Sequence, residues 1–361
     1  MSIHSSKRSM SSDVRIGLVG AGWFGSIHLE TWESVPGAKV VAVCDIDTRL
    51  REGASVDRTQ DSFHQAAAIR KQKNRDYTFY SDLAEMLNRE DLDVLDVVVP
   101  EAAHFAVVEV GLRAGLPVIV EKPFVTEAHQ AVELCRLACE MGTNLYVGNI
   151  LRFDPRQMAL KETISASAHP IRHMSFQRHF QVSAQKVYGR IHPFFGACVH
   201  DIDLAIWFMG GPPVRVLAVT RSWNREQHPD VVVGLAEWQD GAYAVFQNAW
   251  HVAQSCPYGF EFETKVFLRD ATCIIRNQPD LELWTAEGVR APEFFFWNLA
   301  AGITSGALRN ELSHFYECVR LGVPSDRIPS RDACAGIAVA EALVHSSETA
   351  EWELIGEAVS S

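Results

Sequence analysis

The sequence predicts an α/β domain with a doubly wound parallel sheet, followed by an α+β domain whose large sheet is mostly antiparallel. Three observations support this prediction. Between residues 14 and 147, short apolar segments alternate with helical stretches. Beyond residue 149, longer strand-like segments follow one another with turn signals between them. The length of 361 residues also suggests two domains, at about 100–200 residues each.

The first domain is predicted over residues 13–149, after a polar lead-in at residues 1–12 that we expect to be disordered. Its strands are short and mostly apolar, which is typical of strands buried on both faces of a parallel sheet. We expect them at residues 14–19, 39–44, 94–99, 117–120 and 144–147. Helices are predicted between them, up to about residue 35 and at 81–87, 105–114 and 126–141.

The second domain is predicted over residues 150–361. An amphipathic helix at 196–209 comes first, since Val199, Ile202 and Ile206 share one face at helical spacing. Strand-like segments then follow at 214–223, 231–238, 242–251, 261–268, 272–276 and 281–285. Two helices, at about 310–321 and 330–350, close the chain.

The composition excludes several classes of protein. A net charge of −12 repels phosphate backbones, so we expect no nucleic-acid partner. No apolar run reaches the ~18 residues of a membrane span, and the polar start of the chain is no signal peptide. The 8 cysteines lie mostly in apolar stretches, where cysteine behaves as a small hydrophobe. We therefore expect a soluble, cytoplasmic protein that does not bind membranes.

A glycine motif, Gly20-x-Gly22-x-x-Gly25, follows the first predicted strand and opens a helix. Gly20 permits a tight turn, Gly22 lets the backbone approach a pyrophosphate, and Gly25 lets the helix pack closely on the strand. The phosphates would lie at the helix N-terminus, beside Trp23 and Phe24. This strand–turn–helix context indicates a dinucleotide-binding (Rossmann) domain, and the alternative is a chance cluster of glycines in a turn.

An acid stands about twenty residues after the motif, at the end of the second strand. Asp45 would accept hydrogen bonds from the ribose hydroxyls and would repel a 2′-phosphate, so NAD is favoured over NADP as the cofactor. Arg49 favours NADP instead, because it could pair with the 2′-phosphate if Asp45 turned aside. Asp45 could also be an ordinary acid at a strand end.

Two residues are candidates for proton transfer. Lys122, in the segment Glu121-Lys122-Pro123, directly follows a predicted strand, and ligands of open α/β sheets lie beyond the carboxyl ends of the strands. A lysine there could donate to a reacting oxygen, or carry a proton if burial lowers its pKa. His200, on the first helix of the second domain, could shuttle the proton of a hydroxyl. The alternatives are a surface lysine and a core histidine.

Further residues are expected around the two ligands. With the glycine motif, the predicted cofactor contacts are Pro100, His104, Glu121 and Lys122. The predicted substrate contacts are Lys122, Arg152, Tyr188, His192, His200 and Asp203. For Arg152 a structural ion pair is the alternative, and Asp203 could orient His200 from one helical turn away. We expect no metal, because no histidine–acid spacing matches a ligand set, and no serine hydrolase, because no G-x-S-x-G elbow occurs.

The chain resembles the Gfo/Idh/MocA oxidoreductases, the glucose–fructose oxidoreductase and inositol dehydrogenase group. The matching segments are VGAGWFG at 19–25, CDID at 44–47, EKPF at 121–124, NILRFDP at 149–155 and HDIDLAIW at 200–207. The C-terminal helices look similar too, so the resemblance spans about residues 14–355. It implies a Rossmann domain, then an open-faced sheet domain, and hydride transfer between a nicotinamide and a carbon of a sugar, polyol or related compound.

The resemblance places the family's catalytic lysine on Lys122 and its histidine on His200. It also implies a lysine–proline bond that is often cis. One position departs from the pattern: many dehydrogenases of the family carry an aspartate one turn before the histidine, where this chain has Gly196. Either Tyr188 or His192 supplies that contact, or the substrate differs, or the oxidoreductase reaction has been lost.

Three functions follow from these residues. The first is an NAD(P)-dependent dehydrogenase or reductase. The others are a glycosidase that cycles its NAD through a transient oxidation, and a non-catalytic NAD-binding regulator. We also expect a homodimer or homotetramer, because Val245, Phe246, Ala249 and Trp250 suggest an apolar sheet face that needs a partner.

Overall fold

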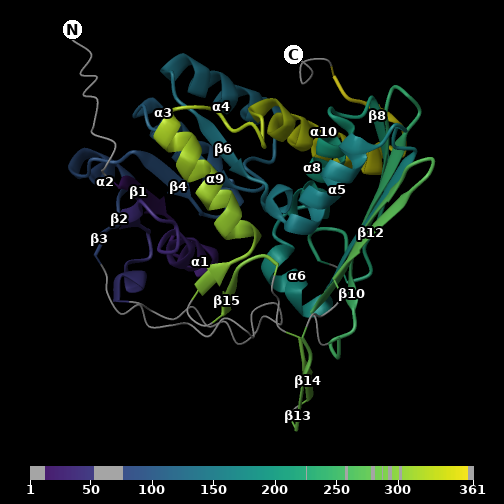
Figure 1. Cartoon of the computed structure of the whole chain (residues 1–361), viewed down its shortest axis with the longest axis horizontal. Coiled ribbons are helices and arrows are strands. Elements are labelled where there is room, and N and C mark those ends of the chain that lie inside the picture. The colour runs from purple at the N-terminus through teal and green to yellow at the C-terminus, as the bar shows by residue number, and fades with distance from the viewer. Residues whose placement is uncertain are drawn as a thin grey trace.

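The computed structural model describes residues 13–52, 76–224, 226–256, 259–277, 281–286, 288–291, 295–300 and 303–356. The predicted lead-in at residues 1–12 lies outside them. The first domain lies on the left of Figure 1 and the large second sheet on the right, with helices between the two. None of the described helices is long and apolar enough to cross a membrane.

The first domain contains a six-stranded parallel sheet in the order β3-β2-β1-β4-β5-β6. Its strands are β1 (Val14–Val19), β2 (Ala38–Cys44), β3 (Thr78–Tyr80), β4 (Val94–Val97), β5 (Val118–Glu121) and β6 (Leu145–Gly148). Between them run α1 (Trp23–Trp32), α2 (Leu83–Arg89), η3 (Glu101–Ala103), α3 (His104–Arg113) and α4 (Ala128–Met141). The predicted doubly wound parallel sheet is confirmed. The strand order reverses between β1 and β4, and ligands of such sheets bind outside the carboxyl ends at this point.

The second domain contains a seven-stranded sheet in the order β12-β11-β7-β10-β9-β8-β17. Its strands are β7 (His173–Gln181), β8 (Arg215–Arg221), β9 (Val231–Glu237), β10 (Tyr243–Val252), β11 (Phe260–Phe267), β12 (Thr272–Arg276) and β17 (Glu353–Leu354). β7 and β10 pair in parallel, and the other neighbouring strands pair antiparallel. The predicted, mostly antiparallel sheet is therefore confirmed.

Helices connect this sheet to the first domain. The chain enters through η4 (Ile150–Phe153) and α5 (Pro155–Ala166), and continues after β7 with α6 (Val182–Tyr188), α7 (Pro193–Gly196) and α8 (Val199–Met209). A hairpin of β15 (Asn298–Ala300) and β16 (Ile303–Ser305) precedes α9 (Ala307–Leu321) and α10 (Ser330–Thr349). The last two helices return to the first domain, where Tyr146 of β6 donates a hydrogen bond to the carbonyl oxygen of Val323, at 2.8 Å.

The structure differs from the predicted elements at several places, including strand β3 and helices α5 and α6, which were not predicted. Strand β7 was not predicted, because polar residues fill much of its length and give it little apolar contrast. The segment 281–285 forms no part of the large sheet: β13 (Leu283–Thr285) pairs with β14 (Gly288–Arg290) in a hairpin that projects from the molecule (Figure 1). The helix predicted at 196–209 is divided into α7 and α8.

Helices cover one face of the second sheet. In Figure 1, α5, α8 and α10 lie between this sheet and the first domain, and no helix is drawn on the far side. Side chains of β10 alternate accordingly, since Phe246 and Trp250 are buried while Val245 and Ala249 are half-exposed. The sequence analysis assigned these four residues to one apolar face, and that assignment was wrong. Phe246 and Trp250 lie on the covered face, whereas Val245 and Ala249 lie on the open face.

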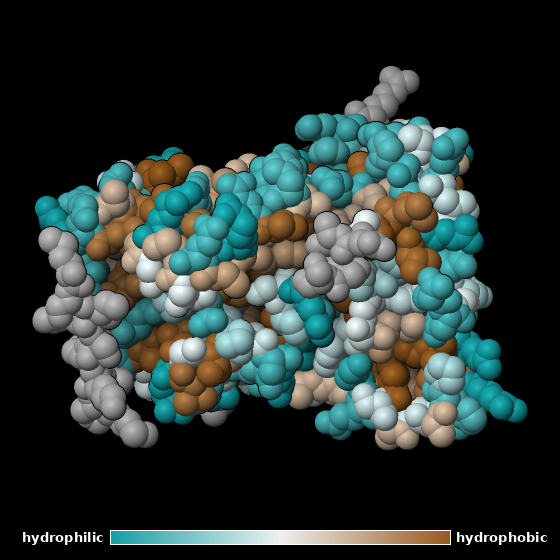
Figure 2. Space-filling model, turned by 90° about the horizontal axis from the view of Figure 1, so that it is seen from above, coloured by the Kyte–Doolittle hydropathy of each residue, from teal (hydrophilic) through white to brown (hydrophobic). Residues whose placement is uncertain are grey.

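The surface on the side of α4 and α10 is mixed. Seen from above, hydrophobic residues reach this surface in several separate places among hydrophilic ones (Figure 2). The open face of the second sheet carries valines instead, and Val219 of β8 is 51% exposed while Val233 of β9 is 41% exposed. The open sheet face is therefore a candidate for contact with another copy of the chain.

Candidate active site

The glycine motif forms a cradle at the carboxyl end of β1. Gly20 has a φ of +97°, and a Cβ there would collide with the carbonyl oxygen of Val98. A Cβ on Gly25 would collide with the carbonyl oxygen of Gly20, whereas one on Gly22 would meet nothing within 4 Å. Packing thus requires glycine at the first and third positions, and Gly22 leaves open the space that a pyrophosphate needs.

Among the described residues, no side chain caps the N-terminus of α1. Gly22 is its N-cap residue, and its first turn holds no acid. The backbone amides at Trp23 and Phe24 can therefore face an anion, as the first amides of a helix do in dinucleotide sites. The two rings turn toward Trp297 of the later chain, with centroid distances of 6.0 Å and 5.3 Å. Cofactor contacts of the Trp23 and Phe24 side chains stay predictions.

Asp45 follows β2 and supports this loop. One carboxylate oxygen accepts a hydrogen bond from the amide of Ala21 at 2.7 Å, and the other from the amide of Asp47 at 2.8 Å. Arg49 donates two hydrogen bonds to Asp47, at 2.8 and 2.7 Å. The basic side chain that could attract a 2′-phosphate is therefore held by a neighbouring acid, while Asp45 presents a carboxylate where a ribose would bind.

Lys122 reaches from the end of β5 into the second domain. The Lys122–Pro123 bond is cis, as the family resemblance implies. The Nζ atom of Lys122 donates to the carbonyl oxygen of Gly196, at 3.3 Å. Burial lowers the pKa of Lys122 to about 8, and the positive charge of Arg178 adds to the shift while Glu121 opposes it. An amine with this pKa exchanges protons readily near neutral pH.

His200 lies in the first turn of α8. Its Nδ1 atom is buried and has no hydrogen-bond partner within the described part of the chain. Burial, together with the positive charges of Lys122 and Arg178, holds its pKa well below the usual value. The imidazole is therefore neutral at physiological pH and can accept a hydrogen bond through one ring nitrogen. Lys122 of the first domain and His200 of the second are thus close enough for the charge of the lysine to affect the histidine.

Arg178 is a site residue that the sequence analysis missed. It lies buried in β7 and donates two hydrogen bonds to Asp201, at 3.1 and 2.8 Å. Its charge lowers the pKa of both Lys122 and His200. The available signal was Asp201, because a carboxylate on an otherwise apolar helix needs a buried partner. Arg178 could not be identified as that partner, because strand β7, which carries it, was not predicted.

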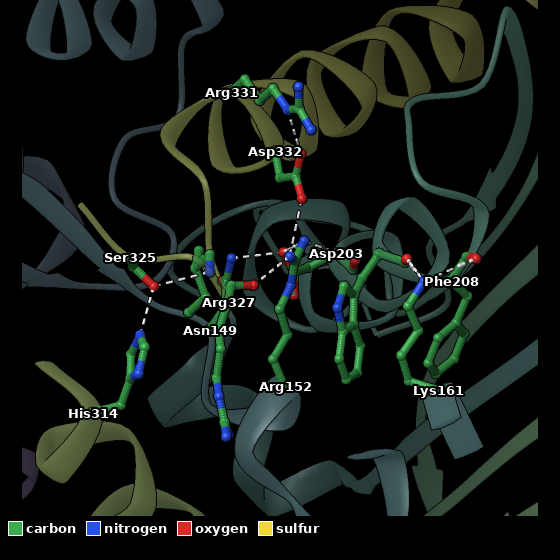
Figure 3. A network of polar contacts seen from close by, with 12 residues as sticks. Asn149, Arg152, Lys161, Asp203, Phe208, His314, Ser325, Arg327, Arg331 and Asp332 are labelled. Carbon is green, nitrogen blue, oxygen red and sulfur yellow. Dashed lines mark hydrogen bonds and ion pairs between the residues drawn. The ribbon is translucent and has the colours of Figure 1, made fainter. Parts of the chain in front are cut away.

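Arg152 and Asp203 belong to a buried network rather than to an open surface (Figure 3). Arg152 donates to both carboxylate oxygens of Asp203 at 2.9 Å and to Asp332 at 3.0 Å, and Asn149 donates to Asp203 at 2.7 Å. Arg152 is 0% exposed and Asp203 is 2% exposed. The network joins η4, α8 and α10, so this geometry favours the structural ion pair that the sequence left open for Arg152.

Glu121 is buried and bridges Lys122 to the interior of the first domain. Its Oε2 accepts a hydrogen bond from the amide of Lys122 at 3.1 Å, and its Oε1 lies 3.3 Å from Nε2 of His28. The Nδ1 atom of His28 lies 3.0 Å from Asp96, which also accepts from Trp32 at 2.7 Å. Burial alone would lower the pKa of His28, but Asp96 and Glu121 raise it to about 10. A charged imidazolium thus lies between two carboxylates, one of which, Glu121, bonds to the amide of Lys122.

His104 and Pro100 follow the end of β4. Both ring nitrogens of His104 face carbonyl oxygens, of Pro123 at 2.9 Å and of Val99 at 2.8 Å. Burial lowers the pKa of His104, so the neutral ring donates to one of the two. His104 is 1% exposed and joins the ends of β4 and β5, whereas Pro100 is exposed before η3. Cofactor contacts of these two residues stay predictions.

Tyr188 and His192 are the candidates to replace the aspartate that is missing at position 196, and the structure describes them only in part. His192 is the N-cap residue of α7, where Nδ1 accepts a hydrogen bond from the amide of Phe194 at 3.3 Å. Burial and the nearby His228 lower the pKa of His192 to about 4. Tyr188 ends α6, but its side chain lies outside the described residues. Substrate contacts of Tyr188 and His192 stay predictions.

A small cavity lies between the domains beside Lys122. Its lining includes Lys122, Phe124, Asn149, Val199, Asp203 and Gly336. Within the residues that the structure describes, no group of three histidines, cysteines or acids could hold a metal ion. The site combines one lysine, one neutral histidine and a dinucleotide cradle.

Comparison with known families matches both domains to one group. Residues 14–149 match the model described as the oxidoreductase family with an NAD-binding Rossmann fold, GFO/IDH/MocA. Residues 173–271 match the GFO/IDH/MocA C-terminal domain. The two matches together span more than half of the chain.

Curated proteins and solved structures agree with these matches. The chain is 26% identical to a D-apiose dehydrogenase of Paraburkholderia graminis, over 90% of this chain and 85% of that protein. It is 28% identical to an inositol 2-dehydrogenase of Rubrobacter xylanophilus, over 56% of this chain and 54% of that protein. A solved scyllo-inositol dehydrogenase of Lactobacillus casei, with bound NAD(H) and scyllo-inositol, has a TM-score of 0.75 at 19% identity, over 97% of this chain and 100% of that one. This last similarity supports the fold.

Proposed function

Because the chain belongs to the Gfo/Idh/MocA family of oxidoreductases, whose first domain is an NAD-binding Rossmann fold, we propose that it is an NAD-dependent dehydrogenase or reductase acting on a hydroxyl-bearing carbon of a sugar or polyol. One observation carries the proposal. Lys122 stands at the carboxyl end of β5 with its Nζ against the second domain, 3.3 Å from the carbonyl oxygen of Gly196. A proton-exchanging group thus stands where ligands of such sheets bind.

The cofactor would be held by the first domain. The open space at Gly22 and the N-terminus of α1 suit the pyrophosphate, and Asp45 suits the ribose hydroxyls. When bound, NAD supplies the nicotinamide carbon that accepts or donates hydride. The protein's own contribution is to bind, to orient and to move the proton.

The proton would pass through Lys122. In the direction of oxidation, neutral Lys122 accepts the proton of the reacting hydroxyl as hydride leaves the carbon. A pKa of about 8 keeps a useful fraction of the amine neutral near physiological pH. His200, which is neutral, binds the same or an adjacent hydroxyl through a hydrogen bond, and its lowered pKa leaves the proton on Lys122. In the direction of reduction, protonated Lys122 donates to the carbonyl oxygen of the substrate.

The charges around the site favour a neutral polyhydroxyl substrate. Arg178 is already neutralised by two hydrogen bonds to Asp201, and Arg152 by Asp203 and its neighbours. No free guanidinium among the described residues of this site therefore stands ready for a carboxylate or phosphate. Hydroxyl groups both donate and accept, as an amine and a neutral imidazole require. The relatives named for apiose and inositol fit the same class.

A substrate screen tests this function. The purified protein is incubated with NAD and a panel of pentoses, hexoses, inositols and their phosphates, and NADH absorbance is followed. We expect NADH formation with at least one neutral sugar or polyol, and its loss in Lys122→Ala. Hydrolysis of glycosides without net NADH would favour the glycosidase instead. Saturable NAD binding with no turnover in either direction, over the whole panel, would favour the regulator.

We further propose a homodimer or homotetramer that buries the open face of the second sheet. Val219 and Val233 are exposed there beside half-exposed Val245 and Ala249, which together form an apolar surface without a helix layer. We place the protein in the cytoplasm, since a chain with 8 cysteines and no predicted disulfide framework suits a reducing compartment.

A further inference from the structure

We propose that Cys135 and Cys334 are a redox-responsive pair, and that their oxidation to a disulfide links the two domains. Cys135 lies on α4 of the first domain and Cys334 on α10, 199 residues further along the chain. Their Sγ atoms are 3.0 Å apart. Non-bonded heavy atoms prefer a separation of roughly 3.5–4.0 Å, and a disulfide bond measures about 2.05 Å. The two sulfurs are therefore closer than ordinary contact, and little movement would join them.

The packing of the two helices sets this approach. At the start of α4, the amide of Ala128 donates to the carboxylate of Glu341 on α10, at 3.4 Å. Ala128 precedes Cys135 by seven residues and Glu341 follows Cys334 by seven, so the helices run antiparallel with contacts about two turns apart. The helices lie together at the top of Figure 1. The helix register thus places the two cysteines opposite each other.

We assign Cys334 as the attacking thiol. Either sulfur can be the donor of the hydrogen bond between them. This contact lowers the pKa of Cys334 and, together with burial, raises the pKa of Cys135. The thiolate is the form that reacts with oxidants. Cys334 is 7% exposed and Cys135 is half-buried, so a small oxidant has the best access. Hydrogen peroxide, which is close to water in size, is the oxidant we assign.

The oxidation balances in two steps. The Cys334 thiolate attacks one oxygen of hydrogen peroxide, the O–O bond breaks, and a sulfenic acid and hydroxide form. The Cys135 thiol then attacks the sulfenic sulfur, the S–S bond forms, and the sulfenic oxygen leaves as water. The two thiol hydrogens and the peroxide end as two molecules of water, with both sulfurs oxidised and the peroxide reduced. A thiol reductant reverses the change.

The disulfide would affect the candidate active site through α10. Asp332, two residues before Cys334, bonds to Arg152 in the buried network. Gly336, two residues after it, lines the cavity that also contains Lys122. A disulfide to α4 would fasten this end of α10 to the nucleotide-binding domain. It would also close a long loop in the unfolded chain, which stabilises the folded state.

Mass spectrometry and thermal unfolding of the full-length protein test the pair. The reduced protein is treated with hydrogen peroxide at low molar excess, its free thiols are alkylated, and the digest is searched for linked peptides. We expect Cys135 and Cys334 to escape alkylation and to appear in one linked pair that a thiol reductant separates. We also expect the unfolding midpoint of the oxidised protein to rise by several degrees, roughly 5 °C.

Cys139 provides the matched control. It is exposed on the same helix, one turn after Cys135, and Cys139→Ser should keep both the linkage and the shift of the midpoint. Cys135→Ser should lose both, and its half-buried position keeps the test usable if Cys334→Ser does not fold. The proposal is overturned if both cysteines stay alkylated under conditions that oxidise Cys139. It is also overturned if Cys139 replaces Cys135 in the linkage, or if the midpoint shift survives in Cys135→Ser.

Discussion

The Nζ atom of Lys122 lies 3.3 Å from the carbonyl oxygen of Gly196, at the position where the family resemblance leads us to expect an aspartate. A carbonyl oxygen can hold the amine in place, but it lacks the net negative charge that would favour the ammonium form. Burial therefore dominates the pKa of Lys122 and brings it to about 8, although Glu121 opposes the shift. The backbone contact keeps this lysine positioned and ready to lose its proton.

Lys122→Ala should lower kcat by roughly 10²–10⁴-fold while NAD affinity changes little, because positioned proton-transfer groups contribute about that much. In the wild type, the rate of oxidation should rise with pH through about 8, since only the neutral amine accepts the proton. Steady-state kinetics and calorimetry check both statements. Turnover of Lys122→Ala within a few-fold of wild type would show that the lysine is structural.

Lys161 offers a control for the loss of a partly buried lysine. It donates to the carbonyl oxygen of Trp207 at 2.7 Å (Figure 3). It is not one of the residues assigned to cofactor or substrate. Lys161→Ala should keep kcat within a few-fold of wild type, together with its pH dependence. Lys122→Arg is the complementary variant, because a guanidinium keeps its charge and cannot act as a base.

Gly196→Asp should move the pH profile upward. A carboxylate beside Lys122 would favour the ammonium, so the pKa of the lysine should rise by about one unit or more, and oxidation at neutral pH should slow. Gly196→Asn is the matched control, because it adds nearly the same volume without the charge. The profile of kcat/KM against pH separates the two. Equal profiles for the two variants would mean that the added group acts by bulk alone.

The cofactor preference should depend on two acids. We expect NAD to bind at least about tenfold more tightly than NADP, because the Asp45 carboxylate would repel a 2′-phosphate. Asp47→Asn should narrow this difference by weakening the two hydrogen bonds that hold Arg49. Asp45→Asn should narrow it further, by removing the repulsion. Titration calorimetry with both cofactors measures the order, and tighter binding of NADP to the wild type would contradict the assignment.

The sequence predicted the first domain well because its information is local. A glycine motif between a strand and a helix specifies a turn, and the structure gives each glycine a different steric surrounding, as Gly20 and Gly22 show. Lys122 could be identified for the same reason, since the end of a parallel strand is recognisable from the strand itself. The opposing carbonyl of Gly196, 74 residues away, could not be read from that segment.

Pairing over long distances accounts for what the sequence did not reveal. Strand β7 looks polar, yet Arg178 is buried there because Asp201 neutralises it from a helix 23 residues further on. The open face of the second sheet was misassigned because both faces of β10 carry apolar side chains, and only the helix layer distinguishes Phe246 from Val245. His28 drew no attention, since both its acidic partners lie on later strands.

Assembly should depend on the open sheet face. Val233→Asp introduces a charge on β9 within the proposed contact and should shift the protein toward monomers. Val110 on α3 of the first domain is also 41% exposed, so Val110→Asp is a control with the same chemistry at another surface. Light scattering at micromolar concentration measures both. A wild-type monomer would count decisively against the proposal, and an equal effect of the two variants would point to general destabilisation.

The His28 cluster should make stability depend on pH. The folded-state pKa of His28 is raised to about 10 from an ordinary value of 6.5 by Asp96 and Glu121, which outweigh burial. The contribution of His28 to the free energy of unfolding is therefore fully present below about pH 6.5 and is lost as pH rises through about 10. At about 1.4 kcal/mol per unit, the free energy of unfolding should gain up to about 4 kcal/mol from this residue at neutral pH. Between neutral pH and pH 9.5, part of that gain should disappear.

Chemical denaturation of wild type and His28→Gln at several pH values isolates this contribution. Lys122 acts in the opposite direction over part of the same range, because its lowered pKa costs stability until the lysine loses its proton. Both proteins contain Lys122, so the difference between them reports His28. His129→Gln is the control, since His129 is largely exposed and its pair with Glu127 should matter little. We expect the wild type to lose more stability with rising pH than His28→Gln, and parallel curves would mean that His28 is neutral in the folded protein.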